Sequence, residues 1–91
     1  MSEKVTFIDY LLLLSTQALY GLGAIADPQS GKTEVNLPLA RYTIDILGLL
    51  EEKTRGNLTQ EESALLADTL TQLRLTFVDV AEKEKKKSEG G

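Results

Sequence analysis

Apolar residues recur at helical spacing in three segments of the chain. When successive residues are placed 100° apart, most of the apolar side chains from Phe7 to Leu22 fill an arc of about 160°, and Leu13 and Tyr20 lie on the far side of the helix. The third segment repeats its apolar residues at intervals of four and three, like a coiled-coil seam, at Leu66, Leu70, Leu73, Phe77 and Val80. The pattern predicts an all-α fold with three helices, at about residues 6–22, 37–53 and 60–82.

The residues at the starts of these segments are typical of helix caps. Thr6 and Asp9 have the spacing of a capping box, and so do Thr59 and Glu62. Asn36 is a suitable cap for the second helix. The caps agree with the apolar pattern on where each helix begins.

The connection between the second and third segments is short and ends the second helix clearly. Lys53 suits the negative end of a helix, and Gly56 can take the left-handed conformation that closes a last turn. Because so few residues intervene, helices two and three are expected to form an antiparallel hairpin.

One stretch of the third segment also fits a strand. Residues 73–77 alternate between apolar and polar, and residues 76–80 are rich in strand formers. The coiled-coil seam enters this stretch without a break, and no turn residue precedes it. A continuous helix is therefore the better interpretation.

The first and third segments carry more apolar surface than one neighbouring helix covers. A helix packed on one neighbour needs an apolar stripe of about 100°. Leu13 and Tyr20 lie outside such a stripe, and Leu75 and Val78 lie off the seam of the third helix. We therefore expect a homo-oligomer, with a dimer favoured, and a candidate oligomer surface made of Leu12, Leu13, Tyr20, Leu75 and Val78.

Length and composition support self-association. A domain of 91 residues buries roughly 60% of the surface that its unfolded chain exposes, so small domains often need a disulfide, a metal or a partner. The sequence has no cysteine and no histidine, which argues against a disulfide, a zinc site or a haem. We expect a single helical domain at residues 1–82 with no metal and no cofactor.

The charge of the chain argues against a nucleic-acid partner. The net charge is −4, which repels a phosphate backbone. The one basic cluster, Lys83–Lys87, is interrupted or flanked by Glu82, Glu84 and Glu89. We expect residues 83–91 to form a charged, disordered tail.

The N-terminal segment has some features of a secretory signal. Residues 10–26 are largely apolar, and Ala24-Ile25-Ala26 mimics a cleavage site. Polar residues 15–17 interrupt the stretch, however, and Glu3 cancels Lys4 where a signal would be basic. The stretch is also too polar and too short to cross a bilayer. We expect a cytoplasmic protein that does not contact the membrane.

Two other stretches resemble known binding motifs without their context. Ala26–Thr33 matches a loose phosphate-loop pattern, but Asn36 and Pro38 place the next helix start several residues later and no strand precedes the loop. The second and third helices are not expected to be a helix-turn-helix, because Glu61 and Glu62 would face phosphates. A polar linker and a plain hairpin are the better interpretations.

Asp45 is a charged residue inside an apolar stretch. Arg41 stands one turn before it, and the simplest interpretation is an exposed pair of small energetic value. Counting residues back from Lys53 and on from Thr59 puts Asp45 and Arg74 about 10 Å apart in height. We therefore expect no bridge between them within one chain, and a bridge between two chains stays open.

No group of residues fits a catalytic site. Histidine and cysteine are absent, and the serines have no candidate base other than carboxylates and lysines on solvated faces. The carboxylates near the hairpin turn are simpler to explain as cap and helix-end residues: Glu51, Glu52, Glu61 and Glu62. We do not expect an enzyme.

Three segments of the chain carry a family resemblance. They are Ile44–Leu47, the K-T-x-G-N-L segment Lys53–Leu58, and Leu73–Leu75. With them, the chain from about Phe7 to Val78 resembles a family of small bacterial proteins catalogued as domain of unknown function eighteen forty-four. The resemblance implies a short helical cytoplasmic protein, and it brings no established activity, substrate or cofactor.

The resemblance also marks the positions that belong to the family pattern: Asp45, Lys53, Thr54, Gly56, Asn57 and Arg74. Most of them have a structural explanation, since Gly56 permits the turn and Asn57 can bond backbone groups that the turn exposes. A ligand site at the turn is the alternative, because polar residues on loops often carry function.

The sequence does not identify the biological role. The leading expectation is a non-catalytic small helical protein that self-associates. The alternative is an adaptor that docks another protein through the apolar face of the first helix or through the Lys53–Thr59 turn. A more remote alternative is a small molecule bound between helices.

Overall fold

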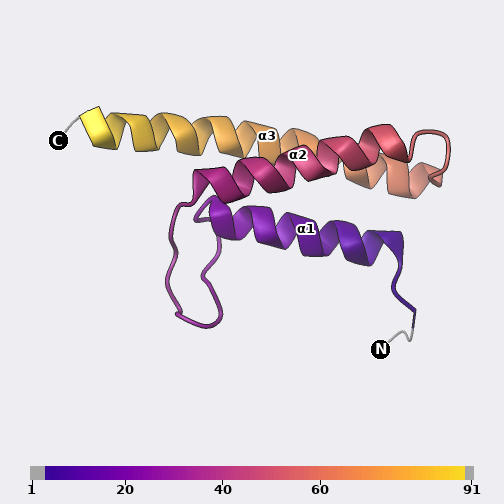
Figure 1. Cartoon of the computed structure of the whole chain (residues 1–91), viewed down its shortest axis with the longest axis horizontal. Coiled ribbons are helices and arrows are strands. Elements are labelled where there is room, and N and C mark those ends of the chain that lie inside the picture. Colours follow the sequence, from indigo (N-terminus) through magenta and orange to yellow (C-terminus); the bar gives the residue numbers. More distant parts are fainter. Residues whose placement is uncertain (1–3, 90–91) are drawn as a thin grey trace.

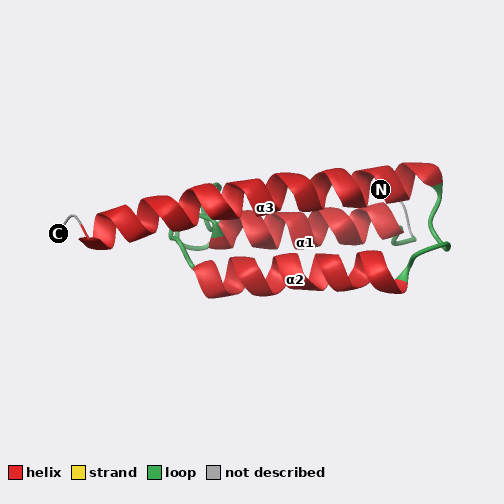
Figure 2. Ribbon diagram, turned by 90° about the horizontal axis from the view of Figure 1, so that it is seen from above, coloured by secondary structure: helices red, strands yellow, loops and turns green. Residues whose placement is uncertain are grey.

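The computed structural model describes residues 4–89 of the chain and confirms the three-helix, all-α fold. The helices are α1 (Phe7–Gly21), α2 (Leu37–Lys53) and α3 (Gln60–Glu89). They lie side by side with nearly parallel axes, α2 running opposite to α1 and α3 (Figure 1; Figure 2). Each helix contacts both others, so the chain forms one bundle. No strand occurs within residues 4–89.

Both predicted capping boxes are present and fix two of the helix starts. At α1 the Asp9 backbone N–H donates to Thr6 Oγ1 at 3.1 Å, and the Thr6 N–H donates to the Asp9 carboxylate at 3.0 Å. At α3 the same pair of bonds joins Thr59 and Glu62, at 3.1 and 2.9 Å. These bonds satisfy backbone donors that have no partner inside the helix.

The ends of α2 also follow the sequence prediction. Asn36 accepts a hydrogen bond from the Leu39 N–H at 3.2 Å and caps the start. At the other end the Thr54 N–H donates to the Leu50 carbonyl at 2.9 Å, and Gly56 has a φ of 84° in the turn that follows. Only glycine adopts that φ at low cost, which is why the turn forms there.

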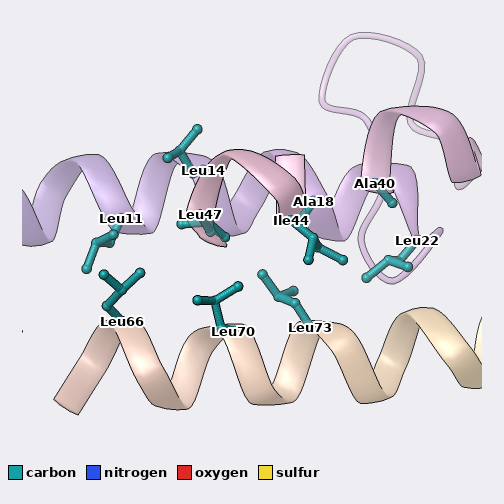
Figure 3. Packing of buried hydrophobic residues seen from close by; sticks show 10 residues of the cluster. All are labelled: Leu11, Leu14, Ala18, Leu22, Ala40, Ile44, Leu47, Leu66, Leu70 and Leu73. Atoms are coloured by element: carbon teal, nitrogen blue, oxygen red, sulfur yellow. The ribbon is translucent and has the colours of Figure 1, made fainter. Parts of the chain in front are cut away.

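The core is a single cluster to which all three helices contribute. Its buried apolar members are Leu11, Leu14, Ala18, Leu22, Ala40, Ile44, Leu47, Leu66, Leu70 and Leu73. Figure 3 shows the leucines of α3 pointing toward side chains of both α1 and α2. Each fully buried leucine contributes roughly 1.5–3 kcal/mol relative to an exposed one, so this small cluster carries much of the stability.

The linker between α1 and α2 is tied back to the bundle at its two ends. Leu22 and Val35 form an isolated antiparallel bridge, and the Asn36 N–H donates to the Gly21 carbonyl at 2.7 Å. Between these points the chain leaves the bundle as a loop beyond the end of α1 (Figure 1). The bonds explain how a long polar connection still holds α1 and α2 as neighbours.

The third helix is longer than expected. It continues through residues 73–80 without a break and ends at Glu89 rather than near residue 82. Residues 83–89, for which we expected disorder, are helical; residues 1–3 and 90–91, also covered by the domain and tail predictions, lie outside the described residues. Glutamate and lysine are good helix formers, and Lys83 pairs with Asp79 one turn earlier at 3.1 Å, which favours this extension.

The length of the bundle is set by α3. A helix of 30 residues, such as α3, spans about 45 Å, and the long axis of the molecule is 48 Å. Its last turns project beyond α1 and α2 (Figure 2). None of the helices within residues 4–89 combines the length and the apolar character that a membrane crossing needs.

Candidate functional site

The hairpin turn holds four of the six positions of the family pattern, and most of its polar groups serve the backbone. The Thr54 hydroxyl donates to the Leu50 carbonyl at 2.6 Å, and the Asn57 N–H donates to the Thr54 carbonyl at 2.8 Å. Gly56 supplies the left-handed conformation. Lys53 is the exposed last residue of α2, and the Asn57 side chain is also exposed. The turn is therefore built mainly by local structural bonds.

A hollow of about 330 Å³ lies beside this turn. Its charged lining residues, Glu51 and Arg55, have opposite signs, and Leu58 and Leu66 form part of its apolar lining. Within the described residues, no group of three or more histidine, cysteine or carboxylate side chains is placed to hold a metal ion. The hollow has room for a small ligand, but its lining residues do not form a group of charged or polar side chains that would select a particular ligand.

The other two positions of the pattern, Asp45 and Arg74, line a groove between α2 and α3. The groove measures about 280 Å³ and is completed by Arg41, Ile44, Phe77 and Val78. We expected Asp45 and Arg74 to lie about 10 Å apart in height, and that estimate is wrong. As expected, Asp45 and Arg74 form no ion pair with each other.

The error comes from the shape of the turn. The estimate placed Lys53 and Thr59 at the same height, whereas α3 begins beyond the end of α2 (Figure 2). Residues near the middle of α3 therefore lie opposite residues closer to the start of α2. Arg74 consequently reaches α2 directly: its Nη2 atom would lie 3.2 Å from a Cβ placed on Gly48.

The residues predicted as an oligomer surface are mostly exposed but do not share one side of the bundle. Leu12, Leu13, Leu75 and Val78 are exposed, whereas Tyr20 is half-buried. Leu12 and Leu13 are consecutive in a helix, so their side chains point about 100° apart. Val78 lines the groove between α2 and α3. The structure therefore divides the predicted set among several surfaces.

Three exposed apolar residues within the helices were missed from the sequence: Tyr10, Tyr42 and Leu49. With Leu13, Tyr20 and the half-buried Ile46 they form two stripes, at spacings of three and seven on α1 and of four and three on α2. We call these six residues the α1–α2 face: Tyr10, Leu13, Tyr20, Tyr42, Ile46 and Leu49. The signal was present in the 3-4 spacing of α2, which carries a second apolar stripe beside its buried one.

The loop that resembles a phosphate loop has a different structure. It follows a helix, and α2 begins at Leu37, four residues after Thr33. Its amides serve the loop itself: the Gln29 N–H donates to the Asp27 carboxylate at 2.8 Å, and the Gly31 N–H donates to the Asp27 carbonyl at 2.7 Å. Backbone donors that already have these partners do not form a phosphate cradle, which agrees with a polar linker.

Thr43 is the buried polar residue of the described core. Its hydroxyl donates to the Leu39 carbonyl at 2.9 Å. No buried side-chain nitrogen or oxygen within residues 4–89 lacks a hydrogen-bond partner. The interior of the described bundle therefore contains no buried side-chain polar atom that lacks a partner and could bind a ligand. The candidate sites all lie on its surface.

Comparison with known proteins gives one relationship. No curated protein and no solved structure matches the chain. A family model described as "Domain of unknown function (DUF1844)" matches residues 4–79, which include α1, α2, the hairpin turn and α3 as far as Asp79. The chain therefore belongs to the DUF1844 family of domains of unknown function.

Proposed function

We propose that this chain is a non-catalytic helical module whose role is to self-associate, as a homodimer. The observation that carries the proposal is the number of large apolar side chains that the three helices leave exposed, on α1, α2 and α3 alike. A small core on a chain of 91 residues is also a situation in which association adds needed stability.

The proposal of a non-catalytic role rests on the chemistry of the chain. Histidine and cysteine, the commonest general base and the strongest side-chain nucleophile, are absent from the sequence. The carboxylates Asp9 and Glu62 cap helices, and Asp79 pairs with Lys83. None of these groups is set in a pocket beside a second reactive group, which is what acid–base chemistry needs.

Sedimentation equilibrium or light scattering tests the proposal directly. We expect the wild-type chain to be a dimer at tens of micromolar protein. A mass corresponding to the 10.0 kDa monomer over that concentration range would overturn it.

A second candidate function is docking of another protein, and the groove between α2 and α3 favours it. Arg41, Asp45 and Arg74 line this groove together, and no ion pair joins them. Charged groups on an exposed groove that apolar residues also line can steer and orient a partner. In an affinity capture, a partner that is retained by wild type and by Lys85→Glu but lost with Arg74→Glu would support docking through the groove. Loss with Asn57→Ala instead would point to the turn.

A further inference from the structure

The side of α2 that lies next to α3 carries charges of alternating sign. It presents four positions in line: Arg41, Asp45, Gly48 and Glu52. Their spacings of four, three and four residues keep them within an arc of about 60° at 100° per residue. Arg74 of α3 adds a positive charge at Gly48, because its Nη2 atom lies 3.2 Å from a Cβ placed on that residue. The order along α2 is therefore positive, negative, positive, negative, and we call the four charged residues the charge stripe.

The charge stripe has no partner in its own chain. All four of its residues are exposed, and within residues 4–89 none of their side chains forms an ion pair or a hydrogen bond. Arg41 and Asp45 are one turn apart, a spacing at which opposite charges often pair on a helix. Glu52 lies in the last turn of α2, where a carboxylate is unfavourable beside the negative helix end. These charges are therefore available to another molecule.

The alternation is what a two-fold symmetric contact requires. In such a contact one patch faces itself, so each charge must meet the opposite charge when the order is reversed. At 1.5 Å per residue, Asp45, Gly48 and Glu52 lie about 6, 10.5 and 16.5 Å from Arg41 along α2. The midpoint of Arg41 and Glu52 lies about 8 Å from Arg41, and the midpoint of Asp45 and Gly48 is the same point. Reversal about this point brings Arg41 opposite Glu52, and it brings Asp45 opposite the guanidinium group of Arg74.

This charge complementarity points to a second copy of the chain as the partner. Every copy carries the pattern that pairs with the reversed stripe, so no other molecule is needed to match it. Nucleic acid does not match it, because Asp45 and Glu52 alternate with the two arginines and repel successive phosphates. Uncharged residues also line the groove beside Asp45, namely the half-buried Phe77 and the exposed Val78. Apolar residues bordered by charged ones are the usual composition of a specific interface.

We propose that two copies of this chain associate through their charge stripes, antiparallel and related by a two-fold axis at the common midpoint. This pairing rests on the self-association proposed above and names the surface that carries it. Each Arg41 pairs with Glu52 of the partner subunit, and each Asp45 pairs with Arg74 of the partner subunit. Because of the symmetry, both ion pairs occur twice. The α2 helices of the two copies face each other across the axis, and so do the α3 helices.

An interface held by these ion pairs depends on salt concentration. The distance over which charges act in solution falls from about 10 Å at 0.1 M salt to about 3 Å at 1 M. By sedimentation equilibrium we expect the dimer dissociation constant to rise about tenfold or more between these two concentrations. An apolar interface would not weaken in this way. A dissociation constant that stays constant or falls as salt is added would therefore overturn pairing through the charge stripes.

Reversal of either charge in the central pair is expected to break the dimer. Asp45→Arg places a positive charge opposite the partner's Arg74, and Arg74→Glu places a negative charge opposite the partner's Asp45. The symmetry makes each substitution act at two contacts. We expect each variant to raise the dissociation constant about tenfold or more, because like charges across an interface repel. Both residues are exposed, so circular dichroism should show the helical content of the wild type.

Two substitutions outside the charge stripe make the same changes of charge and serve as matched controls. They are Asp68→Arg and Lys86→Glu, at exposed residues of α3 that lie about 120° around the helix from Arg74. We expect each control to change the dissociation constant less than about threefold. Equal weakening by the controls and by the stripe variants would mean that net charge alone governs association, which would overturn the proposed pairing.

A mixture of the two stripe variants makes the test independent of any effect on folding. Asp45→Arg chains repel one another, and so do Arg74→Glu chains. In a heterodimer, however, the new arginine faces the new glutamate, and the native Asp45 faces the native Arg74. We therefore expect an equimolar mixture to form dimers with about the wild-type dissociation constant. A mixture that stays monomeric, like its two components, would overturn the proposed contact between these residues.

The outcomes separate this interface from the proposed function. A wild-type monomer at tens of micromolar overturns both. A wild-type dimer that Asp45→Arg and Arg74→Glu leave intact overturns the charge-stripe interface, while the proposed self-association stands. A different protein that binds the monomer and is lost with Arg74→Glu would assign the groove to that protein, which also overturns the pairing of two copies.

Discussion

Gly21 at the end of α1 lies against the backbone of Ala40 in α2. A Cβ placed on Gly21 would lie 2.8 Å from the Ala40 amide nitrogen and 3.0 Å from the Asn36 carbonyl oxygen. Ala18 and Ala40 are both completely buried at this crossing. Small side chains let the two helices approach closely, and the Asn36 N–H bond to the Gly21 carbonyl fixes the approach. The geometry of the first two helices, and with it the α1–α2 face, depends on this contact.

Substitution of Gly21 is therefore expected to destabilise the fold. Gly21→Ala forces backbone atoms apart, and we expect a loss of roughly 1–3 kcal/mol in the free energy of unfolding. Gly48→Ala is the control, because there the new Cβ meets only the mobile end of the Arg74 side chain, at 3.2 Å. Alanine is the better helix former, so this variant should gain roughly 0.5–1 kcal/mol. Urea unfolding at one protein concentration measures both, and equal effects would contradict the close contact.

The helices could be predicted because their signals are local. Thr6, Asn36 and Thr59 act through bonds to residues three positions away, and the structure shows each of them as a cap. The close contact of Gly21 with Ala40 could not be predicted in this way, since the two residues meet only after the linker has folded back. The end of α3 was misplaced for another reason: mixed charges after residue 82 resemble a solvated tail and also form helix well.

The capping box of α3 is expected to contribute measurably to stability. Thr59→Ala removes the side-chain acceptor of the Glu62 N–H, and we expect a loss of about 1 kcal/mol. Thr71→Ala is the matched control. Its hydroxyl bonds the Ala67 carbonyl on the exposed side of the same helix, where alanine is the better helix former. Thermal unfolding should show a lower midpoint for Thr59→Ala but not for Thr71→Ala. A similar decrease in both variants would mean that the capping bond of Thr59 does not contribute to stability beyond that of an ordinary threonine in this helix.

We expect the buried Thr43 side chain to contribute to stability through its branched shape rather than through its hydroxyl group. The hydroxyl bonds the Leu39 carbonyl, an oxygen that also belongs to the backbone ladder of the helix. Thr43→Val keeps the branched shape, and we expect stability to change by less than about 1 kcal/mol. Thr43→Ala leaves a cavity and should cost roughly 1–2 kcal/mol. A larger loss for valine than for alanine in urea unfolding would show that the hydroxyl itself is required.

The candidate surfaces were predicted less completely than the helices. Leu13 and Tyr20 were recognisable because α1 has an unusually wide apolar arc. Tyr42 and Leu49 were not, because exposure depends on which side of α2 the other helices occupy. The shared groove of Asp45 and Arg74 was missed for a similar reason: the offset between α2 and α3 is set by the path of the turn, which residue counting does not give.

The end of α3 is expected to form helix without stabilising the bundle. Val80 is the last residue of α3 that packs against the core, and the ion pair beyond it joins side chains that are 74% and 63% exposed. Such surface pairs contribute at most a few tenths of a kcal/mol to stability. A chain that ends at Glu82 should therefore lose helical circular dichroism in proportion to the residues removed, while its free energy of unfolding, measured in urea, stays within about 0.5 kcal/mol of wild type. A chain that ends at Asp79 loses Val80 and should unfold at lower urea. If the chain ending at Glu82 were destabilised as much as the chain ending at Asp79, the projecting turns would have to be part of the folded unit.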